Sequence, residues 1–127
     1  MQFLYVFIGG GLGAVCRYMA TTAIGARFGR MFPFGTLLVN TVGSFFMALV
    51  MGILLSLAKS ANMLPESLRL LLTVGFLGGF TTFSSFSMET LTLINGGNIF
   101  LALANVCANV LLGLGAAILG FHIAAAL

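Results

Sequence analysis

The sequence predicts an all-α membrane protein in which four helices cross the lipid bilayer. Hydrophobic residue types make up 61% of the 127 residues, only 6% are charged, and the mean hydropathy is +1.21. A soluble domain normally carries about 25% charged residues. Four apolar segments, at about 2–24, 34–58, 64–94 and 99–126, are each long enough for a helical span, and the alternating pattern of a membrane β-strand is absent. We therefore expect residues 1–127 to form a single four-helix transmembrane domain.

The first two segments predict simple helical spans. The chain starts with MQFLYVFIGG, which has no basic residues ahead of its apolar run, so we expect a permanent span and not a cleaved signal peptide. Arg17 interrupts this first segment, whereas the second has no formal charge. Pro33 and Pro65 stand where the second and third helices should begin, a position that tolerates a missing N–H group.

The third segment predicts a broken helix. Its roughly thirty residues exceed the length that one straight crossing needs, and its middle reads GGFTTFSSFSMET from Gly78 to Thr90. Gly75, Gly78 and Gly79 lead into this cluster of hydroxyl side chains, so we expect the helix to break near Gly78. The main-chain carbonyls freed there need a partner in protein, water or an ion.

The short connections and the glycines predict how the spans assemble. Short loops make neighbouring spans antiparallel, and the fourth segment completes the set. Four thin spans cannot enclose much of a pathway alone, so we expect a homodimer. Close helix contacts are permitted by several small residues, namely Gly9, Gly13, Gly43, Gly75, Gly79, Gly113 and Gly120.

The basic residues leave the orientation in the membrane open. Arg27 and Arg30, together with Arg17, fall toward one side, and Lys59 and Arg69 fall toward the other. This near balance does not decide the orientation under the positive-inside rule. Either the chain inserts both ways up, or a weak bias is enough to orient it.

Nucleic-acid binding and catalysis are not supported. The five basic residues form no basic stripe. Glu66, Glu89 and the single His122 provide no acid–base pair and no nucleophile with a base beside it, so we expect no enzyme. The stretch IGGGLGAV imitates a dinucleotide-binding fingerprint, but no acidic residue follows about twenty positions on. We therefore assign its glycines to helix packing.

Polar side chains at membrane depth are the remaining candidates for function, because lipid makes them costly. Some could bond to their own helix or join two helices. Hydroxyls and amides also donate hydrogen bonds without net charge, and phenylalanine ring edges are electropositive, which suits a small dehydrated anion. The polar residues are Arg17, Asn40, Thr81, Thr82, Ser84, Ser85, Ser87, Glu89, Asn105 and Asn109, and the rings are Phe80, Phe83 and Phe86, spaced three apart for one helix face.

Four stretches occur in order along the chain: GGGLGAVCRY, GTLLVNTVGSF, GFLGGFTTFSSFS and NVCANVLLG. Together they resemble the bacterial fluoride channels, the CrcB or Fluc family, and the third stretch is the most specific. The resemblance implies an antiparallel, dual-topology homodimer that exports fluoride passively through narrow pores across the bacterial inner membrane. It also implies a structural sodium ion at the centre of the dimer.

The resemblance further implies roles for particular residues. The sodium ion would be held by the main-chain carbonyls of Gly78 and Thr81. The pore and its entrance would be formed by Phe83, Phe86, Asn40, Ser84, Ser85, Asn109 and Arg17. Relatives often carry hydroxyl side chains further along the fourth helix, where this chain has Gly113 and Ala117.

Two alternative functions remain open at this point. A small dual-topology, proton-coupled multidrug exporter needs a carboxylate inside the membrane, and Glu89 is the candidate for it. A non-transporting membrane structural subunit would bind lipid or another membrane protein and pass no ion.

Overall fold

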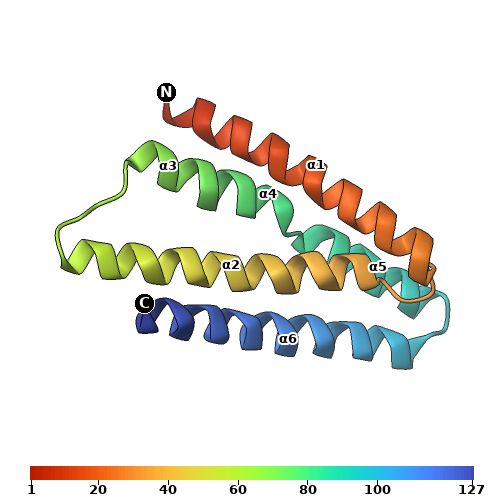
Figure 1. Cartoon of the computed structure of the whole chain (residues 1–127). Coiled ribbons are helices and arrows are strands. Elements are labelled where there is room, and N and C mark those ends of the chain that lie inside the picture. Colours follow the sequence, from red (N-terminus) through yellow and green to blue (C-terminus); the bar gives the residue numbers. More distant parts are fainter.

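The computed structural model describes all residues, 1–127, and is entirely helical (Figure 1). Four helices are long and apolar enough to cross a membrane: α1 (Gln2–Phe28), α2 (Phe34–Lys59), the composite third span (Glu66–Asn95) and α6 (Ile99–Ala126). The expected all-α class with four membrane-length helices is therefore confirmed.

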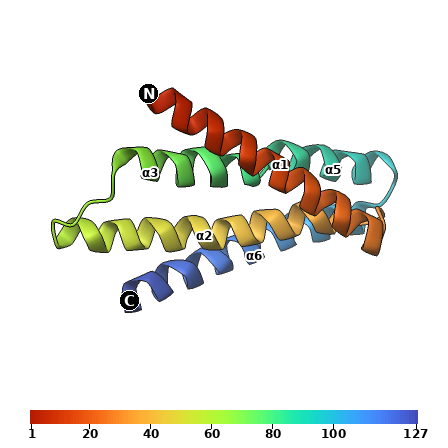
Figure 2. The same cartoon turned by 45° about the horizontal axis from the view of Figure 1, so that its top comes forward.

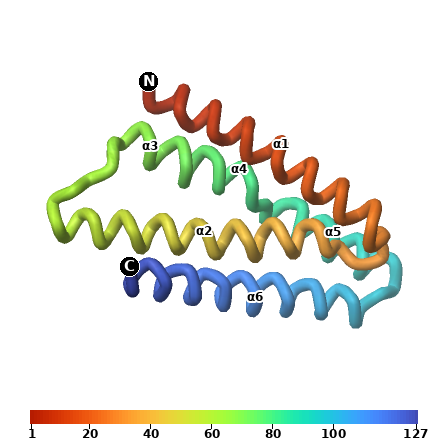
Figure 3. The backbone as a smooth tube through the Cα atoms, viewed as in Figure 1, coloured from red at the N-terminus to blue at the C-terminus, as the bar shows by residue number.

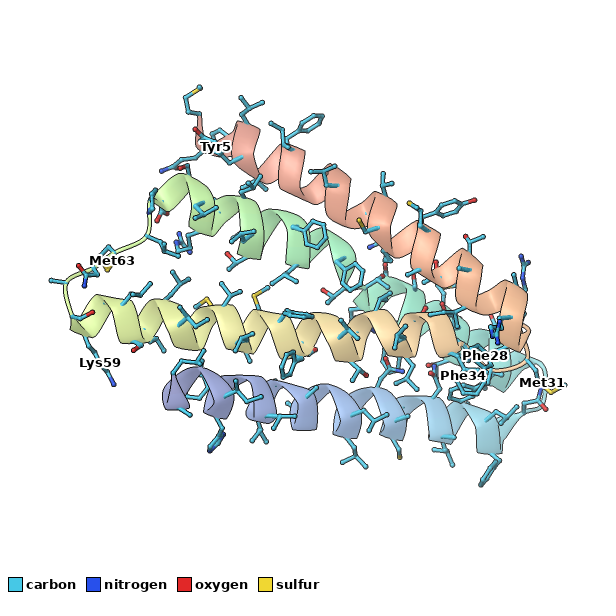
Figure 4. All side chains as sticks on the ribbon, in the orientation of Figure 1. Tyr5, Phe28, Met31, Phe34, Lys59 and Met63 are labelled. Carbon is cyan, nitrogen blue, oxygen red and sulfur yellow. The ribbon has the colours of Figure 1, made fainter.

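Consecutive spans run in opposite directions. Both termini and the α2–α3 connection lie at one end of the bundle, and the α1–α2 and α5–α6 connections lie at the other (Figure 1). Figure 4 labels Lys59 and Met63 at the first end, and Phe28, Met31 and Phe34 at the second. Pro33 and Pro65 immediately precede their helices as expected, since each is the N-cap residue.

The third span consists of several short helices. It contains α3 (Glu66–Leu70), a π-helix η1 (Leu71–Leu77), the short α4 (Gly78–Phe80) and, after an interruption, α5 (Phe83–Asn95). The tube in Figure 3 bends between α4 and α5. Thr81 and Thr82 both have extended backbone there, with ψ of 159° and 117°. The break thus falls at these two threonines, a few residues beyond the expected position.

The glycines before the break permit close helix contacts, as expected, but they do not themselves interrupt the helix. Gly79 stays helical, and a Cβ on it would lie 3.1 Å from the Cα of Gly10 in α1. A Cβ on Gly75 would lie 2.9 Å from the Cα of Gly9, and one on Gly13 would lie 3.0 Å from the main-chain nitrogen of Phe80. Only glycine fits at such distances, so these residues let α1 lie across η1 and α4, a crossing seen in Figure 2.

α2 and α6 form the most extensive helix pair in the molecule. Their backbones approach closely at two points, where a Cβ on Gly120 would lie 3.2 Å from the Leu49 nitrogen and one on Gly52 would lie 2.6 Å from the Ala124 Cβ. This pair holds the side of the bundle opposite α1 (Figure 1). The break therefore lies between two tight helix contacts, one between α1 and the third span and one between α2 and α6.

α1 extends four residues beyond the expected end at residue 24. The helix continues to Phe28 and stops at Gly29, whose φ of +80° lies in the left-handed region that favours glycine. Glycine at this position ends the helix. The expected end was earlier because the apolar run stops before Arg27, although the helix continues through it.

Candidate functional site

Asn40 of α2 holds the break in the third span. Its Oδ1 accepts a hydrogen bond from the N–H of Thr82 at 2.8 Å, and its Nδ2 donates to the carbonyl of Thr82 at 3.0 Å. In a continuous helix that N–H would donate to the carbonyl of Gly78. One side-chain amide thus pairs both main-chain groups of Thr82, which is only 8% exposed.

Arg17 of α1 approaches the break from the other side. Its Nη1 donates to the carbonyl of Gly79 at 2.8 Å and to that of Thr81 at 3.3 Å. Interrupting the helix frees carbonyls, and the guanidinium satisfies two of them with charge-assisted hydrogen bonds. The arginine expected at an entrance is therefore bound to the break itself.

Thr82 also begins the next helix. Its Oγ1 accepts from the N–H of Ser85 at 3.2 Å, which is an N-cap for α5. The Ser85 hydroxyl lies 3.1 Å from the same oxygen and the Ser84 hydroxyl 3.4 Å from it. Ser85 is half-buried and Ser84 is exposed, so these neighbouring serines present hydroxyls to different surroundings.

The three phenylalanines separate into two groups. Phe83 and Phe86 lie on α5 with ring centroids 5.6 Å apart, and the Phe83 ring is 79% exposed. Phe80 instead stacks on Phe76, with centroids 6.0 Å apart and planes 9° from parallel. The expectation that Phe80 shares one helix face with Phe83 and Phe86 was wrong, because the break lies between them.

A groove lies on the α2–α6 side of the break. It has a volume of about 390 Å³ and is termed here the break groove. Phe83 lines it together with Ser44 of α2 and Ala117 of α6. Its full lining is Asn40, Gly43, Ser44, Met47, Ala48, Thr81, Thr82, Phe83 and Ala117. Since Met47 and Ala48 lie past Asn40 along α2, the break groove leads toward the end of the bundle that holds Lys59 (Figure 4).

A second cavity lies on the α1 side of the break. This polar cavity, of about 230 Å³, is lined by Arg17, Tyr18, Thr21, Thr36, Thr82, Ser85 and Glu89. Thr36 donates to Glu89 Oε1 at 2.6 Å across it. An adjoining pocket of about 330 Å³ shares Thr21, Thr36 and Glu89 and reaches Arg30 in the α1–α2 connection. The polar cavity therefore leads toward the opposite end from the break groove.

Thr82 lines both the break groove and the polar cavity. Two hollows that extend toward opposite ends of the bundle are thus separated at the break by Thr82, beside the uncharged amide of Asn40, the hydroxyl of Ser85 and the positive charge of Arg17. Such an arrangement can pass a small ion only if the ion exchanges its water for protein groups over a short distance.

Asn109 of α6 contacts the break indirectly. Its Oδ1 accepts from Asn40 Nδ2 at 3.0 Å, and its own Nδ2 donates to the main-chain and side-chain oxygens of Asn105, both at 2.9 Å. Asn109 therefore belongs to the site, with its amide engaged by Asn40 and Asn105.

The structure brings most of the predicted residues to one place. Arg17, Asn40, Asn109, Phe83 and Ser85 surround Thr81 and Thr82. Phe86 lies one turn further, and Ser84 is exposed at the start of α5. Among groups of histidine, cysteine and carboxylate side chains, none of three or more could hold a metal ion, so a cation at the break would depend on main-chain carbonyls such as those of Gly78 and Thr81.

Sequence reasoning missed Ser44 and Thr36 as members of the site. Ser44 Oγ lies 3.8 Å from the place of a Cβ on Gly113, which puts a hydroxyl of α2 beside the position where the fourth helix lacks one. The signal for Ser44 was its spacing of four residues from Asn40, which places both on the same face of a helix. Thr36 has the same spacing in the other direction.

Comparison with known proteins shows the family of this chain. The family profile described as CrcB-like protein, Camphor Resistance (CrcB), matches residues 4–121. The fluoride-specific ion channel FluC of Magnetococcus marinus is 50% identical over 120 residues, 94% of each chain. That of Granulibacter bethesdensis is 46% identical over 125 residues, covering 97% of this chain and 94% of its own. That of Citrifermentans bemidjiense is 40% identical over 126 residues, covering 99% and 98%. The chain is thus a multi-pass membrane protein that belongs to the CrcB family.

Proposed function

We propose that this protein is a fluoride-selective channel that lets fluoride leave the bacterial cytoplasm passively across the inner membrane. The observation that carries the proposal is the broken third span, where uncharged donors and the exposed Phe83 ring surround a partition between two hollows. Relatives of nearly the same length and up to 50% identity are fluoride-specific ion channels.

The proposed path begins in the polar cavity. Arg17 places a positive charge beside the break, and Arg30 lines the adjoining pocket nearer the end of the bundle. Positive groups at the mouth of a narrow site raise the local concentration of anions. Because the Arg17 guanidinium is hydrogen-bonded to the main chain, its charge attracts fluoride, but its N–H groups are not free to bind the ion tightly.

At the partition fluoride must lose its hydration shell. The Ser85 hydroxyl accepts from Thr82 Oγ1, which leaves its own O–H free to donate to the ion, and the Asn40 amide donates through Nδ2. The ring edges of Phe83 and Phe86 add weak positive potential. The two N–H groups of Asn40 are engaged by Thr82 and Asn109, so fluoride receives one only by replacing that bond. Such exchange keeps binding weak enough for the ion to leave.

We also propose a homodimer of dual topology. The break groove is open and the Phe83 ring is 79% exposed, so a second copy would supply the missing wall of the pathway. With Arg17 bound at the break, the membrane edges carry Arg27 and Arg30 at one end and Lys59 and Arg69 at the other. This equal balance favours insertion in both orientations, which an antiparallel dimer requires.

We further propose a structural sodium ion at the break, where main-chain oxygen atoms are available to it. The Gly78 carbonyl is released from Thr82, whose N–H donates to Asn40, and carbonyl oxygens suit a hard cation. Two carbonyls of one chain do not complete a coordination shell, so a partner copy would add its own. Thr81 could contribute if Arg17 gives up the longer of its two bonds, at 3.3 Å. When bound, sodium would supply positive charge and brace the break.

Fluoride efflux from liposomes tests the function. Purified protein is reconstituted into vesicles loaded with potassium fluoride, and release is followed with a fluoride electrode after addition of a potassium ionophore. We expect rapid release of fluoride and little release of chloride from matched vesicles. Well-incorporated protein that releases no fluoride would refute the proposal, and flux that requires a proton gradient would favour the exporter alternative and direct attention to Glu89.

A further inference from the structure

Asn105 is a fully buried amide in the middle of the last span. Its exposure is 0%, and it is the largest fully buried polar side chain in the molecule. An amide in a membrane helix is stable only when its donors and acceptors are paired. Asn105 meets this need on two sides, since its Nδ2 donates to Thr90 Oγ1 at 2.9 Å and its Oδ1 accepts from Asn109 at 2.9 Å.

These bonds extend into a relay that ends at the break. Asn109 bonds to both Asn105 and Asn40, and Asn40 in turn pairs the main-chain groups of Thr82. The relay therefore starts at Thr90, near the middle of α5, and returns to Thr82, the residue that caps the same helix. Both points on α5 are tied to α2 and α6 through three asparagines.

Main-chain groups fix the direction of every bond in the relay. The carbonyl of Asn105 can only accept, so the NH2 of Asn109 must face it and the Oδ1 of Asn109 must face Asn40. Asn40 must then present its NH2 to Asn109 and to the Thr82 carbonyl, and its Oδ1 to the Thr82 N–H. Only one orientation of the Asn40 amide satisfies all of these partners.

We propose that Asn105 is a positioning residue of the fluoride pathway, which sets the place of α5 relative to Asn40 by binding Thr90 and Asn109 together. The inference rests on the proposed function. Asn105 does not line the break groove or the polar cavity, so it acts through Asn109, Asn40 and Thr90 and not by touching the ion. Losing it would let α5, with Phe83 at its start, shift against Asn40.

The test compares single-channel fluoride currents of wild type, Asn105→Leu, Thr90→Val and the double variant in planar bilayers. Thr92→Val is the matched control. The Thr90 and Thr92 hydroxyls on α5 each donate to the main-chain carbonyl four residues earlier, at 2.8 Å to Phe86 and to Met88, but Thr92 is exposed. Partial misfolding reduces the number of channels, whereas a repositioned pathway changes the current through each one.

We expect Thr90→Val to lower the unitary current about threefold, the equilibrium shift of one interhelical hydrogen bond in a membrane. Asn105→Leu should lower it further, because it also removes the side-chain oxygen that accepts from Asn109. The double variant should stay near the loss of Asn105→Leu alone, since Thr90→Val then removes no additional bond between these two residues. Thr92→Val should match wild type. If Asn105→Leu fails to assemble, Thr90→Val against Thr92→Val decides alone.

A wild-type unitary current in Thr90→Val would overturn the inference. It would also be overturned if the current loss in the double variant equalled the product of the losses in the two single variants, because the two residues would then act independently. Either result leaves the proposed channel function standing, because the wild-type protein conducts in the same experiment. No fluoride current from the wild type overturns the proposed function and this inference with it.

Discussion

Replacing Asn40 by leucine should open the break in the third span and suppress fluoride flux. Asn40 makes three hydrogen bonds, of 2.8 Å, 3.0 Å and 3.0 Å, to the N–H and carbonyl of Thr82 and to Asn109. Interhelical hydrogen bonds in membrane proteins average about 0.6 kcal/mol, so their loss destabilises the break by about 2 kcal/mol. Because Thr82 is buried, the main-chain groups left behind raise this figure.

A loss of about 2 kcal/mol corresponds to about a thirtyfold shift between the observed break and other conformations. We expect fluoride efflux from Asn40→Leu liposomes to fall by at least that order, and the unfolding midpoint in denaturing detergent to fall with it. Both quantities are measured on the same protein preparation, normalised to the amount reconstituted.

Thr41→Val is the matched control for this prediction. Thr41 is the next residue of α2, and its buried hydroxyl has no hydrogen-bond partner in the protein. Removing an unpaired buried hydroxyl is neutral or stabilising, so this variant should keep wild-type flux and stability. Wild-type efflux from Asn40→Leu would show that Asn40 does not hold the break, and an equal loss in Thr41→Val would show that any change in α2 is harmful.

Four further predictions follow from the same structure. Phe83→Ile and Phe86→Ile should each reduce fluoride efflux at least tenfold while gel filtration still shows an assembled protein; a monomeric or aggregated product would mean that the rings serve packing. Gly13→Ala should destabilise the fold by about 1–3 kcal/mol through overpacking against the third span, measured by detergent unfolding, whereas Gly11→Ala, where a Cβ meets nothing within 4 Å, should not; similar midpoints would contradict the close contact. Ser44→Ala should lower efflux severalfold without changing stability, and unaltered efflux would remove Ser44 from the pathway. Replacing sodium by N-methyl-D-glucamine should lower the thermal unfolding temperature, since an ion present at a hundred times its Kd stabilises by about 2.7 kcal/mol; equal temperatures in both buffers would argue against the sodium site.

The sequence predicted the spans and the presence of a break, because long apolar segments and a polar cluster are local signals. It placed the break near Gly78, since glycine is the usual interruption of a helix. The extended residues are Thr81 and Thr82, a few positions later, because Gly75 and Gly79 stay helical where α1 lies against the third span. A glycine that permits a close approach looks the same in sequence as one that breaks a helix.

The sequence predicted most residues of the candidate site but not the hydrogen bonds that join them. Arg17, Asn40 and Asn109 were named from their cost in lipid and from family resemblance, but nothing local indicated that Arg17 bonds to residues 62 and 64 positions away. Asn105 was recognised only as a polar residue in the last span. Its importance depends on Thr90 and Asn109, which the fold brings together across α5 and α6.

The thin partition at Thr82 has an electrical consequence. The break groove and the polar cavity extend toward opposite ends of the bundle, and Thr82 lines both of them, so we expect fluoride to cross between them at this residue. An anion that crosses the whole membrane gains about 2.3 kcal/mol per 100 mV. In a cell that is negative inside by that amount, the voltage alone holds fluoride about fiftyfold lower inside than outside at equilibrium. A passive path past Thr82 therefore lets the resting potential of the cell drive fluoride out with no other source of energy.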